Sequence, residues 1–285
     1  MEEKILTTKK NGMAVLLLTS LLYLAAVAVC VLSSVSMSND ITPLNITGLV
    51  LSIIWLALGW IPFAGLRGLK PQEALVLTLF GKYIGSLKDS GFYFVNPFSI
   101  GVNPAAKTKL NQSGDVDNHS KKDTSIASLL GSNSLSLSEE SSNKKISLKI
   151  MTLNNSRQKI NDCLGNPIEI GIAVTWRVVD TAKAVFNVDN YKEYLSLQCD
   201  GALRNIVRLY PYDTAPDIDT TGDGQADEGS LRGSSEIVAA RIRDEIQKKV
   251  ADAGLEIIEA RITYLAYSPE IAAVMLPVSY THLTL

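Results

Sequence analysis

The sequence predicts two transmembrane helices at the N-terminus, followed by a domain of antiparallel strands and helices. Three patterns in the 285 residues indicate this fold. Two long stretches before residue 70 carry no charged side chain. A later stretch of twelve residues alternates apolar residues with others, which is the period of a half-buried strand. Two further stretches place apolar residues four apart, which is typical of helices that pack on a core.

The overall composition gives no argument for a strongly charged partner. Charged residues make up 20% of the chain and the formal net charge is −2, so we expect no nucleic-acid partner. Hydrophobic residues make up 46%, which is high for a soluble protein. This excess is concentrated in the first seventy residues, and those residues therefore need a separate explanation.

The two uncharged stretches are residues 13–32, "MAVLLLTSLLYLAAVAVCVL", and residues 48–66, "GLVLSIIWLALGWIPFAGL". About 20 apolar residues, at about 1.5 Å each, cross the ~30 Å hydrocarbon core of a bilayer. The connection between them is short, and Asp40 is its one charged residue. Trp55 and Trp60 lie toward the end of the second stretch, where an aromatic belt is expected. The sequence therefore predicts a transmembrane helical hairpin within an anchor of residues 1–66.

Basic residues flank the hairpin on its outer sides, at Lys9, Lys10, Arg67 and Lys70. The positive-inside rule then predicts a multi-pass protein of the cell (inner) membrane, with both termini in the cytoplasm. A cleaved signal peptide is the alternative for the first stretch, because lysines precede it and serines follow it. The apolar run is longer than that of a typical signal peptide, which favours the membrane anchor.

A strand-rich region follows the anchor. Residues 73–98 contain two apolar runs separated by "GKYIGSLKDSG", which predicts a hairpin with that segment as its loop. Residues 111–143 are rich in serine and asparagine and poor in aromatic residues, so they predict a disordered insertion, with His119 as a solvated side chain. Ordered structure is expected again at residues 144–153.

The strongest strand signal follows the predicted turn at residues 164–167. Ile168, Ile170, Ile172, Val174, Trp176 and Val178 alternate with other residues, which gives one fully apolar face. The connections in this region are short, so we expect the sheet to be antiparallel.

Three helices are predicted between residues 180 and 254. Within residues 180–213, Asp180 is positioned to cap a short helix, and Asp189 or Asn190 a longer one that ends before Pro211. Leu195, Cys199, Leu203 and Ile206 recur at helical spacing in the longer helix. This pattern predicts that Cys199 is a core residue rather than a nucleophile.

The third of these helices is predicted within residues 234–254. Ser234 or Ser235 is positioned to cap it, and Gly254 to end it. Its apolar face carries Val238, Ile242, Ile246 and Val250. Residues 255–267 predict one more strand, and Ser268-Pro269 the start of another helix.

No catalytic, cofactor-binding or metal-ligating residue is predicted. The cysteines, Cys30, Cys163 and Cys199, have no metal-site spacing and are interpreted as buried or membrane-embedded free thiols. Residues 217–228, "DIDTTGDGQADE", partly match the calcium-binding loop of an EF-hand when Gly222 is aligned with its sixth position. Thr221 then stands at the fifth position, where a carboxylate or amide ligand is expected, so a solvated acidic loop is favoured. The chain carries no nucleotide-binding, zinc-protease or nucleophile-elbow motif, and we expect no enzymatic activity.

Several of these segments, taken together, resemble the SPFH (band 7) superfamily. They are "GLKPQEALVLTLFGKYIGSLKDSGFYFVNPF", "KKISLKIMTL", "INDCLGNPIEIGIAVTWRVVDTAKAVFNVDNYKEYL", "ALRNIVRLYPYD", "LRGSSEIVAARIRDEIQKKV" and "GLEIIEARITYLAYSPEIA". The resemblance covers residues 67–275. This superfamily includes stomatin, prohibitin, flotillin and bacterial regulators of membrane AAA proteases.

The resemblance implies an α+β domain at the membrane surface that assembles side by side with copies of itself. Such assemblies are scaffolds that organise membrane microdomains and surround client membrane proteins. The implied partners are the chain itself, membrane lipids and a membrane protease, and no catalytic residue carries over. The alternative is a regulatory subunit of a membrane-bound AAA or serine protease, or of a channel.

The last residues depart from this resemblance. In the family a long helix rich in alanine, glutamate and arginine follows "SPEIA", whereas this chain reaches Pro277, past which a helix cannot continue normally. Residues 276–285, which include His282, are therefore expected to be a tail outside the family pattern. Either this chain lacks the assembly helix or its last nine residues are not native sequence, and the second interpretation is favoured.

Overall fold

The computed structural model describes residues 2–7, 11–39, 43–108, 110, 144–213 and 229–271. These form two compact units, described separately below. The smaller unit comprises Lys4–Val102 and Lys144–Ile146, and the larger comprises Met1–Glu3, Asn103–Asn143 and Ser147–Leu285. The predicted insertion at 111–143, the acidic stretch at 217–228 and the tail at 276–285 lie outside the described residues. The domain boundaries that composition predicts at residues 66 and 275 stay predictions.

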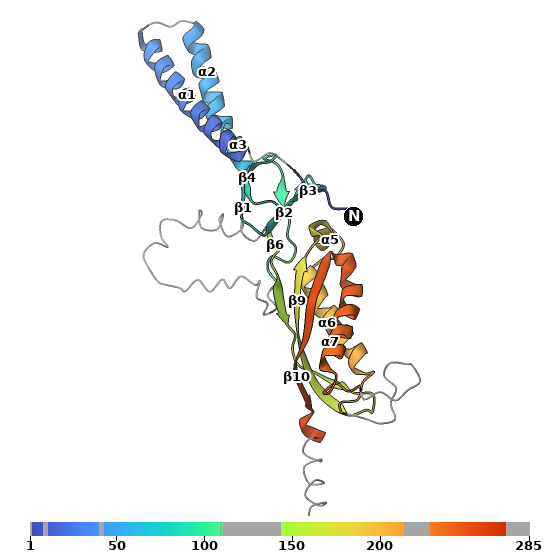
Figure 1. The fold of residues 1–285 in the computed structure, drawn as a ribbon. Helices are drawn as coiled ribbons and strands as arrows, with labels where there is room; N and C mark the ends of the chain where they lie inside the picture. The colour runs from blue at the N-terminus through green and yellow to red at the C-terminus, as the bar shows by residue number, and fades with distance from the viewer. Residues whose placement is uncertain are drawn as a thin grey trace, which may run out of the picture. The chain divides into compact units, whose positions relative to one another are not determined.

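The smaller unit begins with the helical hairpin, in which α1 (Gly12–Asn39) and α2 (Pro43–Leu58) lie side by side (Figure 1). The predicted first helix ended at residue 32, which was too early. α1 continues through the serines that follow, because their hydroxyls bond within the helix, as Ser34 Oγ donates to the Cys30 carbonyl at 2.8 Å. The predicted connection at 33–47 was also wrong, because only residues 40–42 separate the two helices.

The second helix is shorter than predicted. α2 ends at Leu58 and is followed by the one-turn helix α3 (Ile61–Ala64). Pro62 lacks the N–H that would bond to the Leu58 carbonyl, so the helix cannot pass this point unbroken. A strand begins at Leu66, so the helical segment ends close to the predicted bound of the second span, and Ile46–Ala64 is long and apolar enough to cross a membrane.

Six short strands complete the smaller unit: β1 (Leu66–Leu69), β2 (Glu73–Leu79), β3 (Lys82–Leu87), β4 (Gly91–Phe94), β5 (Ile100–Gly101) and β6 (Ile146–Ser147). β2 pairs with β3, β5 and β6, and β1 pairs with β4. The predicted loop "GKYIGSLKDSG" was therefore wrong, since most of it is β3. The chain reverses directly after β2 because Phe80 and Gly81 both have positive φ, and the second apolar run pairs with β1 instead of β2.

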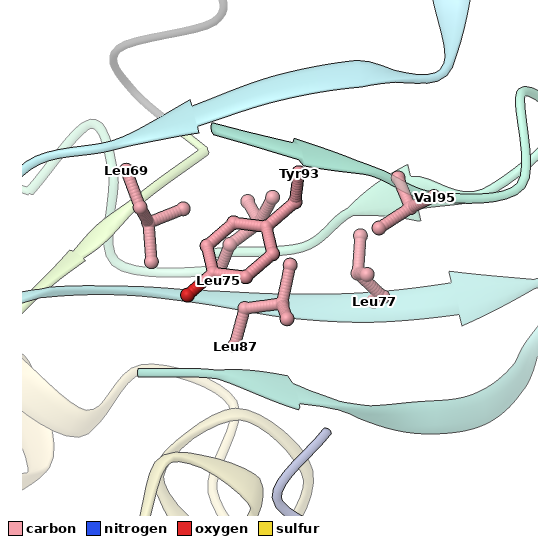
Figure 2. Packing of buried hydrophobic residues seen from close by; sticks show 6 residues of the cluster. All are labelled: Leu69, Leu75, Leu77, Leu87, Tyr93 and Val95. Carbon is pink, nitrogen blue, oxygen red and sulfur yellow. The ribbon is translucent and has the colours of Figure 1, made fainter. Parts of the chain in front are cut away.

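Buried apolar side chains form the core of this unit, and Figure 2 shows them between the strands: Leu69, Leu75, Leu77, Leu87, Tyr93 and Val95. Leu6 packs against the same cluster. Residues 4–6 run parallel to β3 and form a single β-bridge with it, in which Ile5 lies opposite Ser86; we call this short segment the N-terminal strand. Leu6 N donates to the Ser86 carbonyl at 2.9 Å, and Ser86 N donates to the Lys4 carbonyl at 2.8 Å.

The larger unit is built on an antiparallel sheet in which β9 (Pro167–Val178) lies between β10 (Leu255–Tyr267) and β7 (Met151–Asn154). β8 (Gln158–Asn161) also pairs with β9. This arrangement confirms the predicted antiparallel sheet and the predicted strand at 168–178. The even-numbered residues of β9 from Ile168 to Trp176 are completely buried.

Helices pack on this sheet, with α7 (Ser235–Val250) against β10 and α6 (Tyr191–Val207) against α7 (Figure 1). Asp180 caps α5 (Thr181–Phe186) by accepting from Lys183 N, and Asn190 caps α6, as predicted. Ser234 occupies the predicted N-cap position of α7. Its side chain makes no capping hydrogen bond, however, so the predicted capping interaction was wrong. Its backbone lies outside the extended conformation from which a serine hydroxyl reaches the helix N–H groups.

Candidate functional site

The candidate site is a surface, and its main part is the exposed apolar face of the hairpin. Gly12–Ser36 and Ile46–Ala64 are both long and apolar enough to cross a membrane. Their most apolar windows are only 6% and 11% buried, whereas a core helix of a soluble protein is mostly buried. Leu17, Leu24 and Leu32 are 60%, 71% and 68% exposed. No part of the described chain covers these side chains, and a hydrocarbon environment suits them.

The contact between α1 and α2 uses small residues. A side-chain carbon added at Gly48 would lie 2.9 Å from Ser33 Oγ, so the helices approach closely at this glycine. The buried hydroxyls bond within their own helices: Thr19 donates to the Val15 carbonyl and Ser52 to the Leu49 carbonyl, both at 2.8 Å. The hairpin therefore satisfies these polar groups internally, as a structure in lipid must.

The base of the hairpin joins it to the small sheets. Val95 N donates to the carbonyl of Gly65, the residue directly after α3, at 2.9 Å. Gly12, at the start of α1, lies so close to Phe92 of β4 that a side-chain carbon on the glycine would be 2.8 Å from the Phe92 carbonyl. Both ends of the hairpin are thus held by the same pair of strands, β1 and β4.

The N-terminal strand brings the start of the chain into this unit as well. Residues 4–6 precede α1 in the sequence, whereas β3 follows α3, and the two segments are bonded directly through their backbones. Tyr83 also contacts this segment, because the Lys4 N–H donates to its hydroxyl at 3.3 Å. The chain on either side of the hairpin therefore ends in one small folded unit.

In the larger unit, the carboxylate of Glu3 bonds to the first turn of α5. Its Oε1 accepts from Thr181 N at 3.0 Å and from Thr181 Oγ1 at 2.5 Å. A carboxylate is favourable at this position because the first N–H groups of a helix lack partners within the helix and carry partial positive charge. The N-terminal residues thus take part in both units, although they precede a membrane-type helix.

The larger unit exposes a groove of mixed charge beside β10. The groove has a volume of about 530 Å³ and lies between α7 and β10, and its charged lining is Glu236, Arg243, Glu259 and Arg261. β10 is the end strand of its sheet in the described part of the chain, and two irregularities interrupt its pairing with β9. Arg261 Nε donates to Glu259 Oε1 at 2.6 Å. This lining suits contact with another protein surface better than enclosure of a small apolar ligand.

The cysteines differ in their environments. Cys199 is completely buried, as predicted, and this burial, with a smaller effect of Asp200, raises the pKa of its thiol to about 12. Cys30 lies in α1 and is half-buried. Cys163 is exposed, so its predicted burial was wrong. It lies in the turn between β8 and β9, where Asp162 holds the backbone and the side chain has no core to enter.

No group of three metal-ligating side chains comes together in the residues that the structure describes. His119, His282 and the acidic stretch 217–228 lie outside that part of the chain. That the chain has no catalytic, cofactor-binding or metal-ligating residue stays a prediction. Glu245 and Lys249 form an ion pair one helical turn apart on α7, with 3.5 Å between the carboxylate oxygen and the ammonium nitrogen.

The sequence did not predict two features of the smaller unit, the N-terminal strand and the turn at Phe80. Residues 5–7, Ile-Leu-Thr, have the β-branched and apolar character of a strand, and this was the available signal. A three-residue segment is too short, however, for its periodicity to distinguish a strand from other structure. The turn at Phe80 gave no signal, because phenylalanine is not a turn residue.

The SPFH domain / Band 7 family model matches residues 68–276. No curated protein matches the chain. The family match covers more than half of the sequence and confirms the resemblance, and the antiparallel sheets packed with helices confirm the α+β fold. Members of this family are generally membrane-associated, non-enzymatic scaffolds, and the two exposed apolar helices agree with membrane association. The chain belongs to the SPFH domain / band 7 family.

Proposed function

We propose that this chain is a non-enzymatic scaffold anchored in the cell membrane by two crossings, α1 and the α2–α3 segment. The observation that carries the anchor is the pairing of residues 4–6 with β3. A single crossing would separate residues 4–6 from β3 by the bilayer, so two crossings are needed for this pairing. Cleavage of a signal peptide after α1 would remove the same strand, which argues against that alternative.

The domain is proposed to lie in the cytoplasm, with the loop at residues 40–42 on the opposite side. Arg67 and Lys70 directly follow the hairpin and Lys4 precedes it, and the positive-inside rule favours the cytoplasm for these residues. The scaffold role itself is supported by the family match.

Assembly is proposed to bring copies together through the groove between α7 and β10. Its acidic and basic residues allow one copy to offer a carboxylate to the guanidinium of the next. An array of this kind would delimit a patch of lipids and enclose client membrane proteins, for which a membrane protease is one candidate. Such a role requires complementary surfaces rather than a reactive centre.

Cysteine labelling tests the topology. An impermeant maleimide is added to spheroplasts that carry the native Cys163, and to variants with Glu2→Cys or Asp40→Cys. We expect Asp40→Cys to react in intact spheroplasts, and Cys163 and Glu2→Cys to react only after permeabilisation. Labelling of Glu2→Cys and Cys163 from opposite sides would disprove the two-crossing anchor.

Light scattering of the detergent-extracted protein tests the assembly. A particle of many copies is expected. A single copy bound to a stoichiometric second protein would instead support a regulatory subunit of a protease or channel, and would contradict the scaffold.

A further inference from the structure

The outer edge of β10 binds an amide group at one of its ends. Ile257 N donates to Gln247 Oε1 at 2.7 Å, and Gln247 Nε2 donates to the Leu255 carbonyl at 3.2 Å. Since these bonds run to α7, the backbone groups of Leu255 and Ile257 face away from β9. A carboxamide has the same donor and acceptor types as a peptide group, so Gln247 takes the place that a further strand would occupy.

Beyond Ile257 this edge is open in the part of the chain that the structure describes. β10 is the end strand of the sheet there, and the groove of about 530 Å³ runs along its residues 258–262. The pairing of β10 with β9 shifts between Ile257 and Glu259. Paired and unpaired backbone groups alternate along an antiparallel ladder, so those of Ala260 and Ile262 face outward after this shift. An edge with such groups is a template for one more strand.

α7 forms the other wall of the groove and limits what can enter it. α7 lies beside β10 (Figure 1), and its Gln247 reaches the outer edge of the strand. Ala239 and Ala240 line the groove on this side, and their small side chains leave room for a backbone next to them. The β10 strand of a second copy carries its own α7, which would meet the first α7 across the groove. The space therefore fits one extended segment that has no helix behind it.

The charges of the groove determine which segment is complementary to it. Arg261 Nε donates to Glu259 Oε1, and the two residues lie two apart in β10, so their side chains are on one face of the strand. An antiparallel segment would place an acidic residue opposite Arg261 and, two residues later, a basic residue opposite Glu259. A small residue would lie between these two, opposite the buried Ala260. Ile258 and Ile262 line the groove on either side and suit apolar residues at both ends of the segment.

We propose that this groove binds an extended segment of a partner protein, which pairs antiparallel with residues 258–262 and has the order apolar, acidic, small, basic, apolar. In binding of this kind the backbone bonds provide affinity and the alternate side chains provide selectivity. Residues 258–262 of this chain, Ile-Glu-Ala-Arg-Ile, have the same order and therefore supply the sequence of a test peptide. The inference goes beyond the proposed contact between copies, because the occupant is another protein that would compete with a neighbouring copy for the groove.

Fluorescence anisotropy of labelled peptides, added to the full-length chain in detergent, tests this site. The probe is a peptide with the sequence of residues 257–263, Ile-Ile-Glu-Ala-Arg-Ile-Thr, which carries fluorescein at its N-terminus. In the matched control peptide the Glu and the Arg are exchanged, which leaves its composition and net charge unchanged. A third peptide has an N-methyl group on its alanine, whose N–H would donate to the Ala260 carbonyl. The double variant Glu259→Arg, Arg261→Glu exchanges the charges of the groove in the same way.

We expect the parent chain to bind the probe about tenfold more tightly than the control peptide, because the exchange turns two ion pairs across the strands into two like-charged pairs. The double variant is expected to reverse this preference, which a misfolded chain could not do. N-methylation is expected to abolish binding. Equal binding of the probe and the control peptide would overturn the inference, as would unchanged binding of the N-methylated peptide. Absence of binding by every peptide would also overturn it and would leave the contact between copies standing.

Light scattering with saturating probe separates this inference from the proposed assembly. We expect the particle mass to fall, because the peptide and a neighbouring copy would occupy the same groove. Bound probe with an unchanged particle mass would support the peptide site and contradict the groove as the contact between copies.

Discussion

At the scale of single residues, two glycines show how differently the fold uses a positive φ. Gly254 (φ +67°) ends the segment after α7, and its carbonyl accepts from Val179 N at 3.0 Å and Asp180 N at 3.1 Å. A side-chain carbon at Gly254 would overlap the Asp180 carbonyl, whereas one at Gly165 (φ +87°) would have nothing within 4 Å. Gly254 is therefore required for its conformation and its lack of a side chain, and Gly165 for its conformation alone.

Gly254→Ala is expected to lower the free energy of unfolding by more than about 2 kcal/mol, because left-handed strain and steric overlap add. Gly165→Ala is the matched control and should cost about 1 kcal/mol, from the backbone strain alone. Denaturant unfolding of the full chain in detergent measures both. Equal losses for the two variants would contradict the role of the close approach at Gly254.

Cys199 gives a pH dependence whose sign follows from its burial. Burial raises the pKa of this thiol from 9.0 to about 12, so the folded chain keeps a proton that the unfolded chain releases above pH 9. Stability from this residue is complete below pH 9 and falls as the pH rises toward 12. Cys199→Ala is expected to reduce the loss of stability between pH 8 and about pH 10, measured by denaturant unfolding. An unchanged slope would show that the thiol does not titrate differently on unfolding.

At the scale of elements, the N-terminal strand is the least expected part of the fold. Its backbone bonds reach β3, and Leu6 packs against the core cluster. Ile5, between the two bonded residues, is 52% exposed. One face of the strand thus contributes to the core, as in any strand with one buried face.

Leu6→Ala is expected to destabilise the smaller unit by about 1–2 kcal/mol, because it removes partly buried apolar surface. Ile5→Ala, on the exposed face, should change stability by less than about 0.5 kcal/mol. Hydrogen exchange at the Ser86 amide reports this directly, since Ser86 N donates to Lys4. Faster exchange in Ile5→Ala than in Leu6→Ala would rule out the core role of Leu6.

At the scale of the whole molecule, the chain presents one apolar surface and one surface of mixed charge. The hairpin exposes apolar side chains along both helices, which suits lipid. The groove beside β10 places acidic and basic side chains together on an edge strand, where charges also discourage unspecific strand pairing. The proposed scaffold uses the first surface for anchoring and the second for assembly.

Replacing Arg243 and Arg261 together by glutamate leaves only acidic charged residues in the groove, beside Glu236 and Glu259. Because like charges across an interface repel, the particle mass measured by light scattering is expected to fall severalfold at low salt. Arg232→Glu, an exposed site outside the groove, should leave the mass unchanged. A double variant that assembles like the parent chain would exclude the groove as the contact between copies.

The regular elements of the fold were predictable because local patterns decide them. Period-2 alternation identified β9, spacing of four identified the buried faces of α6 and α7, and Asp180 and Asn190 identified two helix starts. Boundaries were less predictable. Serine is a weaker helix former than alanine or leucine, yet serines continue α1, and the turn at Phe80 uses a residue that turns disfavour.

Apolar stretches in the sequence were enough to establish a pair of lipid-compatible helices, and alternation was enough to establish a sheet with one buried face, because both depend on residues that are close along the chain. The tertiary structure alone decided where residues 4–6 pair and which strand partners β4. It also combined Ala239 and Ala240 of α7 with residues 258–262 of β10 into one groove. These features depend on contacts between segments that are distant in sequence, and local periodicity carries no information about them.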